Sequence, residues 1–311
     1  MEKDCALGNW VIQSADLHLL RLYEALKQKL RSQPLIHGDE TWGQVLKEDA
    51  RDAQTTSVMW AYCSGQDSEQ PIVIFEYQSG HGQKHPQDFL GDYRGLLMSD
   101  GYDAWRTLDG AIHLGCMAHA QRKFTDALKA RKKPGGPPLQ ALKFFEALYE
   151  IERLARQTPS EGETRADYIL RLRQQHSVPV LVAFKTWLDD MAPKVLPESF
   201  TGKAISYAQN QWDYLIRYTS NGLAPIDNSV LERDIRPFLT GSKSWLFSDT
   251  VAGAKASAVV YSLMLTCRAC GVEPYAWLRH VLTELPLRPP DANIEDLMPF
   301  NFGERQHRNT C

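Results

Sequence analysis

The first strand-like run of the sequence is Leu35-Ile36-His37-Gly38-Asp39-Glu40-Thr41, in which apolar residues are followed by two acidic residues. A second run of this kind is Leu96-Leu97-Met98-Ser99-Asp100-Gly101-Tyr102. A carboxylate at the end of a buried strand is costly unless it is paired or binds a cation. A third acid, Glu232, lies far downstream in Asp227-Asn228-Ser229-Val230-Leu231-Glu232-Arg233. Two strand ends and a distant helical acid indicate a divalent-metal site built from three separate elements.

Outward from the first run, short apolar segments predict an α/β fold. Runs at 57–63 and 71–77 end in Ser64-Gly65 and Ser79-Gly80, so with 35–39 they predict an antiparallel meander. Further strands are expected at 95–100 and 111–116. Helices are expected at 7–31, 86–93, 103–108 and 119–133. This order predicts a mixed five-stranded sheet flanked by helices.

The run Lys132-Lys133-Pro134-Gly135-Gly136-Pro137-Pro138 interrupts this alternation. Beyond it, 139–217 carries helical apolar spacing and few strand signals, which predicts an all-helical insertion. Downstream we expect a helix from 228 to 236 that stops at Pro237, an extended piece at 244–247, and long helices at 251–270 and 274–285. The predicted segments are an N-terminal helical segment, a first core part, the insertion, a second core part with the third acid, and an irregular C-terminal tail: 1–33, 34–133, 134–220, 221–285 and 286–311.

Composition excludes several classes. The 311 residues carry a net charge of −3, so the chain is no polycation and any nucleic-acid contact must come from local basic patches. The chain contains no stretch of about 18 uninterrupted apolar residues, so no membrane-spanning helix is predicted. The N-terminus shows no signal peptide, and the six scattered cysteines are typical of reduced thiols, which indicates a cytoplasmic protein. The one CxxC pair, Cys267 and Cys270, lies in an apolar helical run and is interpreted as packing.

Each acid also has a local structural explanation. Asp39 is compatible with a turn or cap acid, and its neighbour Glu40 is an equal candidate, since adjacent strand residues face opposite ways. Asp100 precedes glycine in a common turn pair. Ser229-Val230-Leu231-Glu232 matches a capping box, in which Glu232 would bind the backbone N–H of the cap. Pattern alone leaves these alternatives open.

As a set, the acids suit magnesium. Two Mg²⁺ ions about 3.5–4 Å apart can clamp the attacking and leaving oxygens of a phosphoryl displacement, and Mg²⁺ prefers oxygen ligands. Cys116 and His119 form a Cys-x-x-His that lacks a second half for zinc. His119 is therefore interpreted as supporting the site or contacting substrate. Asp227, just outside the predicted helix, is also compatible with a helix cap.

A basic helix follows the fifth predicted strand. It carries six cations, Arg122, Lys123, Lys129, Arg131, Lys132 and Lys133, against one acid, Asp126. Either this is a solvated face or it contacts the phosphate backbone, which would make binding fall steeply with salt. Arg233 and Arg236 lie within a turn of Glu232 and are candidates for phosphate contacts.

Five ordered motifs resemble the bacterial insertion-sequence-66 transposases. They are 37–41, 99–102, 116–124, 227–237 and 243–247, and the resemblance spans about Leu7 to Leu285. It implies an RNase H-like catalytic domain of the DDE type, with a helical insertion between the second and third acids. It matches Asp39, Asp100 and Glu232 to the catalytic, metal-binding triad and favours Asp39 over Glu40. This sequence departs from the family pattern at Met117, Ser229 and Ser244.

The resemblance implies metal-dependent DNA cleavage and strand transfer at the ends of an insertion sequence, with two Mg²⁺ or Mn²⁺ ions. DNA contacts are expected at Arg122, Lys123, Arg233, Arg236 and Lys243, with His119, Asp227 and Asn228 supporting the acids. Expected partners are DNA, further copies in a homodimer or larger assembly, and accessory proteins of the same element, in a nucleoid-associated setting. Family members usually carry an upstream DNA-binding region, so a partial transposase is expected. The alternatives are a non-catalytic remnant that binds DNA or other subunits, and an RNase H-like nuclease that cuts without joining.

Overall fold

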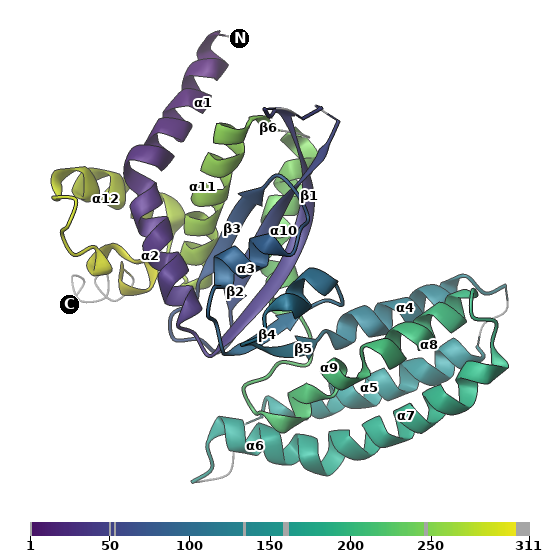
Figure 1. The fold of residues 1–311 in the computed structure, drawn as a ribbon. Coiled ribbons are helices and arrows are strands. Elements are labelled where there is room, and N and C mark those ends of the chain that lie inside the picture. The colour runs from purple at the N-terminus through teal and green to yellow at the C-terminus, as the bar shows by residue number, and fades with distance from the viewer. Residues whose placement is uncertain are drawn as a thin grey trace. The chain divides into compact units, whose positions relative to one another are not determined.

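The computed structural model describes residues 2–49, 51–52, 54–132, 135–157, 162–245 and 248–302, without the side chains of 2–6 and 242–245. The described residues divide into two compact units (Figure 1). Unit 1 comprises 1–95, 103–110 and 230–311, and unit 2 comprises 96–102 and 111–229. Both units contain helices and strands, which confirms the α/β class. The five predicted sequence segments stay a prediction.

Unit 1 is built on an antiparallel meander, as predicted. β1 (Leu35–Lys47) pairs with β2 (Thr56–Ser64), and β2 pairs with β3 (Val73–Gln78). A sixth short strand, β6 (Ser248–Thr250), pairs in parallel with the far end of β1, and the five-strand prediction missed it. The other elements of unit 1 are α1 (Glu2–Ser14), a π-helical turn (Ala15–Leu19), α2 (Leu20–Arg31), α3 (Lys84–Leu90), a 3-10 turn (Asp103–Thr107), most of α10 (Ser229–Trp245), α11 (Val251–Ala269) and α12 (Pro274–Glu284).

Helix α11 covers the edge of this sheet. It lies alongside β3, whose outer edge would otherwise expose unpaired backbone groups (Figure 1). The N–H of Val73 donates to Thr266 Oγ1 at 3.0 Å, and the N–H of Phe75 donates to Ser262 Oγ at 2.7 Å. From α2, Tyr23 Oη donates to the carbonyl oxygen of Phe75 at 2.8 Å. Side chains thus satisfy the edge strand, and the sheet ends there.

The two faces of the meander follow strand alternation. On one face, Ala61 and Cys63 join a core with Leu231 and Ile235 of α10 and with residues of α11. The opposite face carries an aromatic cluster under α3 and the 3-10 turn. Its members are Trp60, Tyr62, Phe89 and Trp105, with the Tyr62 and Phe89 rings stacked at 3.6 Å.

Unit 2 joins a small parallel sheet to a helical bundle. β4 (Leu96–Ser99) pairs in parallel with β5 (Ile112–Gly115), in a register that sets Ser99 opposite Gly115. α4 (Met117–Lys129), α5 (Pro137–Ala155), α7 (Val178–Met191) and α8 (Phe200–Asn210) each pack on two of the others and form a four-helix bundle (Figure 1). Shorter pieces complete it: α6 (Arg165–Leu172), a π-helical stretch (Arg173–Ser177), 3-10 turns (Ala192–Lys194 and Arg217–Ser220) and α9 (Trp212–Leu215).

A buried arginine holds the chain where it leaves the bundle. Arg173 is only 3% exposed and forms a bidentate pair with Glu152, with both N–O distances at 2.7 Å. Its Nη1 also donates to the carbonyl oxygens of Tyr218, Asn221 and Ala224. The side chain therefore joins α5, the π-helical stretch and the returning segment.

Several local predictions were wrong. Asp39 lies in the middle of β1, not at its end, because pairing with β2 continues to Gln44. Helix α10 continues through Pro237 instead of stopping there. The buried side chains of Ile235 and Phe238 on either side of Pro237 retain the helix despite the lost backbone donor. The extended piece expected at 244–247 is helical at Ser244 and Trp245, while 246–247 lie outside the described residues.

Within the described residues 286–302, the C-terminal tail is mostly irregular, and it is packed. It contains 3-10 turns at Leu285–Leu287 and Glu295–Leu297. The indole Nε1 of Trp277 in α12 donates to the carbonyl oxygen of Leu297 at 2.9 Å. Among the described residues, no helix is long and apolar enough to cross a bilayer.

Candidate active site

Asp39 and Glu40 have different surroundings, which bears on the choice that the sequence left open. The carboxylate of Glu40 accepts from the indole Nε1 of Trp105 at 2.9 Å and contacts His81 Nε2 at 2.9 Å. Its side chain is only 10% exposed. Glu40 therefore serves as a structural acceptor within the aromatic face of unit 1.

Gly38 belongs to the same arrangement. A Cβ at this position would lie 2.5–2.6 Å from ring atoms of Trp105, far inside contact distance. The absence of a side chain at Gly38 thus lets the Trp105 ring lie against β1, where its N–H reaches Glu40. The packing of Trp105 therefore explains why residue 38 in the His37-Gly38-Asp39-Glu40 motif is a glycine.

Asp39 faces the other side of the sheet. In the strand register it lies opposite Ala61, and Val45 shares its face three alternations further along β1. Ala61 and Val45 both belong to the core that includes Leu231 of α10, the residue before Glu232. Asp39 Oδ1 accepts from the backbone N–H of Glu40 at 2.9 Å, which orients the carboxylate.

The thiol of Cys63, on the adjacent strand β2, is affected by the charged side chains on this face of the sheet. Burial, above all, raises the pKa of Cys63 well above its ordinary value, and the nearby carboxylate of Asp234 on α10 raises it further. Arg233 opposes this pKa shift, and Asp39 adds to it. Charges from β1 and from the start of α10 therefore act on the same buried group.

Asp100 directly follows β4, as the sequence predicted. Its Oδ1 accepts from the backbone N–H of Tyr102 at 2.8 Å, which is an Asx-turn. The turn that explained Asp100 structurally is thus present. It also fixes the carboxylate at the end of a strand whose four residues are all buried.

The bundle packs closely against the ends of β4 and β5. A Cβ on Gly101 would lie 3.1 Å from Tyr207 Oη and 3.2 Å from Gln211 Nε2, both at the end of α8. A Cβ on Gly115, at the end of β5, would lie 3.0 Å from the backbone nitrogen of Leu215 in α9. Sequence reasoning missed Tyr207 and Gln211, because nothing in their local pattern marks them.

Glu232 lies in the first turn of α10. The helix begins at Ser229, so Ser229 is already helical and does not occupy the N-cap position that the capping box requires. The backbone N–H of Ser229 instead donates to Asp227 Oδ1 at 2.9 Å. Asp227 thus satisfies a backbone donor at this end through an Asx-turn, from one residue outside the N-cap position.

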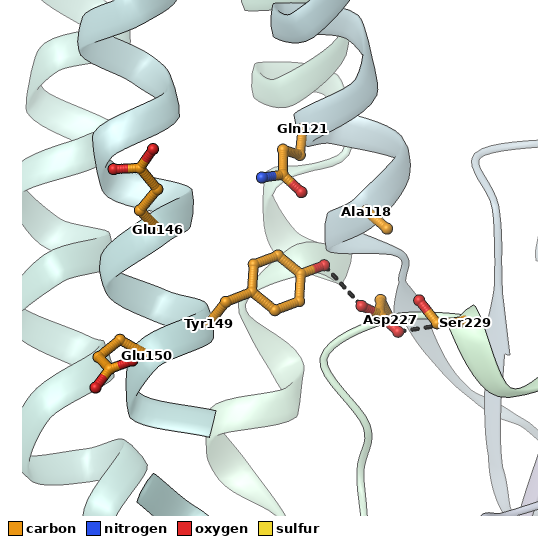
Figure 2. Close-up of a pocket in the computed structure, with 7 residues that line it drawn as sticks. All are labelled: Ala118, Gln121, Glu146, Tyr149, Glu150, Asp227 and Ser229. Atoms are coloured by element: carbon orange, nitrogen blue, oxygen red, sulfur yellow. Dashed lines mark hydrogen bonds between the residues drawn. The ribbon is translucent and has the colours of Figure 1, made fainter. Parts of the chain in front are cut away.

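Asp227 also borders a pocket of unit 2 (Figure 2). The pocket measures about 530 Å³ and is lined by Ala118, Gln121, Glu146, Tyr149, Glu150, Asp227 and Ser229. Tyr149 points from α5 towards Asp227, and its hydroxyl donates to Oδ2 at 2.7 Å. Burial and the Asp227 carboxylate raise the pKa of Tyr149, which keeps its proton on the phenol. The pocket wall is acidic, and of its acids only Asp227 is a residue that the sequence predicted to support the site.

The other two predicted supporting residues lie near the start of α4. Asn228 is fully buried, and its backbone N–H donates to Cys116 Sγ at 3.3 Å. The N–H of Met117 donates to the carbonyl oxygen of Ile226 at 3.1 Å. His119 is half-buried in the first turn of α4. The segment before α10 is therefore attached to the junction of β5 and α4.

The predicted DNA-binding cations are mostly exposed. Arg122 and Lys123 are exposed on α4, and Lys123 Nζ lies 5.5 Å from the centre of the Tyr207 ring. Arg233 and Arg236 are exposed on α10, with Arg233 Nε 3.2 Å from Asp234 Oδ1. The side chain of Lys243 lies outside the described residues.

The fold and the acids define an α/β protein that carries its candidate carboxylates on a strand, at a strand end and at a helix start. Comparison with known families identifies it further. The chain belongs to the IS66 transposase family: residues 3–256 match the model described as "Transposase IS66 family", and residues 262–300 match the IS66 C-terminal element.

Curated relatives include three uncharacterized proteins of Sinorhizobium fredii (strain NBRC 101917 / NGR234). The chain is similar to y4jD, y4hP and y4qI at 29%, 27% and 30% identity. These matches cover 96%, 91% and 91% of this chain, and 60%, 53% and 54% of the relatives. The chain thus spans between about half and three-fifths of their length. No solved structure matches it.

Proposed function

We propose that the chain is the catalytic region of a DDE transposase with an RNase H-like core, which cleaves DNA and transfers strands at insertion-sequence ends. The observation that supports the proposal is that the two acids of β1 have different surroundings. Glu40 is bonded to Trp105 and His81, whereas Asp39 faces the side where α10 packs. This favours Asp39, with Asp100 and Glu232, as the catalytic set.

The donor chemistry of the set fits magnesium. Three carboxylates offer hard oxygen ligands, which Mg²⁺ and Mn²⁺ accept and which leave room for water and substrate oxygens. Backbone N–H groups orient one oxygen of Asp39 and one of Asp100, which limits the reorganisation needed for binding. When bound, two such ions would neutralise the scissile phosphate and activate the attacking oxygen.

The residues of the chain would then act by position and charge. Asp39, Asp100 and Glu232 would bind the ions, and the exposed cations Arg122, Lys123, Arg233 and Arg236, with Lys243, would bind DNA phosphates. Asn228, Asp227 and His119 would hold the segments around the acids. We propose that the active form is a homodimer or larger assembly on DNA, joined by accessory proteins of the same element.

A cleavage and joining assay tests this function. The purified chain is incubated with duplexes from either flank of its own coding sequence, pre-cleaved or intact, with Mg²⁺ or Mn²⁺. Joined product supports the transposase, cut product alone indicates the nuclease, and neither indicates the non-catalytic remnant. Asp39→Asn, Asp100→Asn and Glu232→Gln should each abolish the products. Asp234→Asn, on the same helix as Glu232, is the matched control and should retain them.

If Glu232→Gln cleaves like the parent, the assignment of the third acid is wrong. Circular dichroism of each variant separates lost chemistry from lost folding.

A further inference from the structure

The helical bundle contributes residues to the surroundings of Asp100, and their chemistry suits a phosphate. The Asp100 turn lies beside the end of α8, where the hydroxyl of Tyr207 and the amide of Gln211 approach Gly101. Lys123 of α4 places its ammonium group over the Tyr207 ring. All of these residues lie in unit 2, so the arrangement depends on that unit alone.

These three side chains supply complementary donors. The ammonium group of Lys123 provides positive charge, and the Tyr207 hydroxyl and Gln211 amide are donors of the kinds that commonly contact DNA phosphates. Lys123 is exposed, and Tyr207, Gln211 and Gly101 are half-buried, so solvent and ligand reach the group. Lys123 also contacts one side of the Tyr207 ring, so phosphate binding through the hydroxyl is favoured over base stacking on that side.

The three side chains lie close to the turn that holds Asp100. Asp100 is held by its Asx-turn directly before Gly101, so a phosphate bound by Tyr207 and Lys123 would lie close to the Asp100 carboxylate. The negative charges of the phosphate and of Asp100 would repel each other unless nearby cations and hydrogen-bond donors neutralise them. Lys123, whose ammonium group lies 5.5 Å from the centre of the Tyr207 ring, can serve this purpose.

We propose that Tyr207, Lys123 and Gln211 form a DNA phosphate subsite beside Asp100, which binds a phosphodiester adjacent to the one that is cleaved. The inference rests on the proposed function, since it assumes that Asp100 is part of the catalytic set. It gives the helical insertion a direct role in substrate binding. Tyr207 and Gln211 lie more than 100 residues after Asp100 in the sequence and reach it only through the fold.

Binding to a labelled DNA tests the subsite without any need for cleavage. The probe is a fluorescein-labelled duplex with a single-stranded 3′ overhang, and anisotropy is measured at several salt concentrations without divalent metal. Lys123→Gln should weaken binding and reduce the slope of log K against log salt by about 0.7–0.9, the value for one lost phosphate contact. Lys123→Arg should restore the slope.

Tyr207→Phe removes only the hydroxyl and keeps the ring under Lys123. It should weaken binding roughly tenfold, as expected for one lost hydrogen bond to a charged group, and leave the salt slope unchanged. The matched controls are Tyr168→Phe, a tyrosine of α6 that also carries a cation over its ring, and Lys143→Gln, an exposed cation of α5. Both controls should bind like the parent, and thermal melting should show all variants folded.

The outcomes separate the subsite from the proposed function. If Tyr207→Phe and Lys123→Gln bind like their controls, the subsite is overturned, whether or not the parent cleaves DNA. If the two variants lose binding as expected but the parent cleaves nothing, the subsite stands as a DNA contact and the proposed catalytic function fails.

Discussion

Replacing Glu40 by alanine should destabilise unit 1, although this acid adjoins a proposed catalytic residue. The change removes the acceptor of the Trp105 indole N–H and the partner of His81. Trp105 is fully buried, so its N–H cannot turn to water, and an orphaned buried donor costs about 1–3 kcal/mol. The His81 side chain is 24% exposed, so water can replace part of its contact and its loss costs about 1 kcal/mol or less.

The sum predicts a loss of about 1–4 kcal/mol in the free energy of unfolding, a large share of the roughly 5–15 kcal/mol of an ordinary domain. Urea-induced unfolding, followed by tryptophan emission, measures it. Glu69→Ala, at an exposed acid of the same unit, is the control and should change the free energy by no more than about 0.5 kcal/mol.

Asp39→Asn provides the contrast. An asparagine Oδ1 can still accept from the N–H of Glu40, so unfolding should shift by less than about 1 kcal/mol while cleavage is lost. A Glu40→Ala variant as stable as Glu69→Ala, or an Asp39→Asn variant as unstable as Glu40→Ala, would refute the separate roles of the two faces of β1.

Three further predictions concern packing and thiols. Gly222→Ala should destabilise unit 2 by about 3 kcal/mol or more, because the new Cβ would lie 1.9 Å from the carbonyl oxygen of Ala166. Urea titration measures this loss. The control is Gly43→Ala, where nothing lies within 4 Å of the new Cβ, and it should be near neutral in the same titration. Arg173→Met should cost about 3–5 kcal/mol, because it removes the cation that pairs with the Glu152 carboxylate and donates to three carbonyl groups. Calorimetry that shows no loss of melting temperature would contradict this. Burial raises the pKa of Cys270 to about 12, so its thiolate fraction at pH 8 is only about 10⁻⁴ and iodoacetamide should label it slowly. Because a thiol in the unfolded chain ionises near pH 8.5, this group should stabilise the fold fully below that pH and less as pH rises towards 12. Rapid labelling at pH 8, detected by mass spectrometry, would count against the raised pKa of this partly buried thiol.

The sequence was informative where a feature depends on local pattern. The meander follows from apolar runs closed by short turns, and the bundle follows from helical apolar spacing. The length of β1 did not follow, because 40–47 contains exposed positions such as Trp42 and Gly43 and resembles a loop. Pairing with β2, a tertiary property, extends the strand through these positions.

The candidate site shows the same limit. The roles of Glu40 and Gly38 both depend on Trp105, which lies 65 residues after Glu40 in the sequence. Nothing in the local pattern around β1 indicates that an indole will pack there. Arg173 likewise has a helical context typical of a surface cation, yet contacts across 45–51 residues bury it. Long-range contacts of this kind are fixed by the fold as a whole.

The glycines at the ends of β4 and β5 suggest why the bundle and the acid-bearing strand belong to one unit. Gly101 and Gly115 both lack the Cβ that would press on α8 or α9, so both strand ends are shaped for close approach of the bundle. An insertion that merely extended a surface loop would need no such fit. The turn that presents Asp100 therefore lies against the end of the helix that carries Tyr207, and changes at that end of the bundle should act on the geometry around Asp100 as well as on stability.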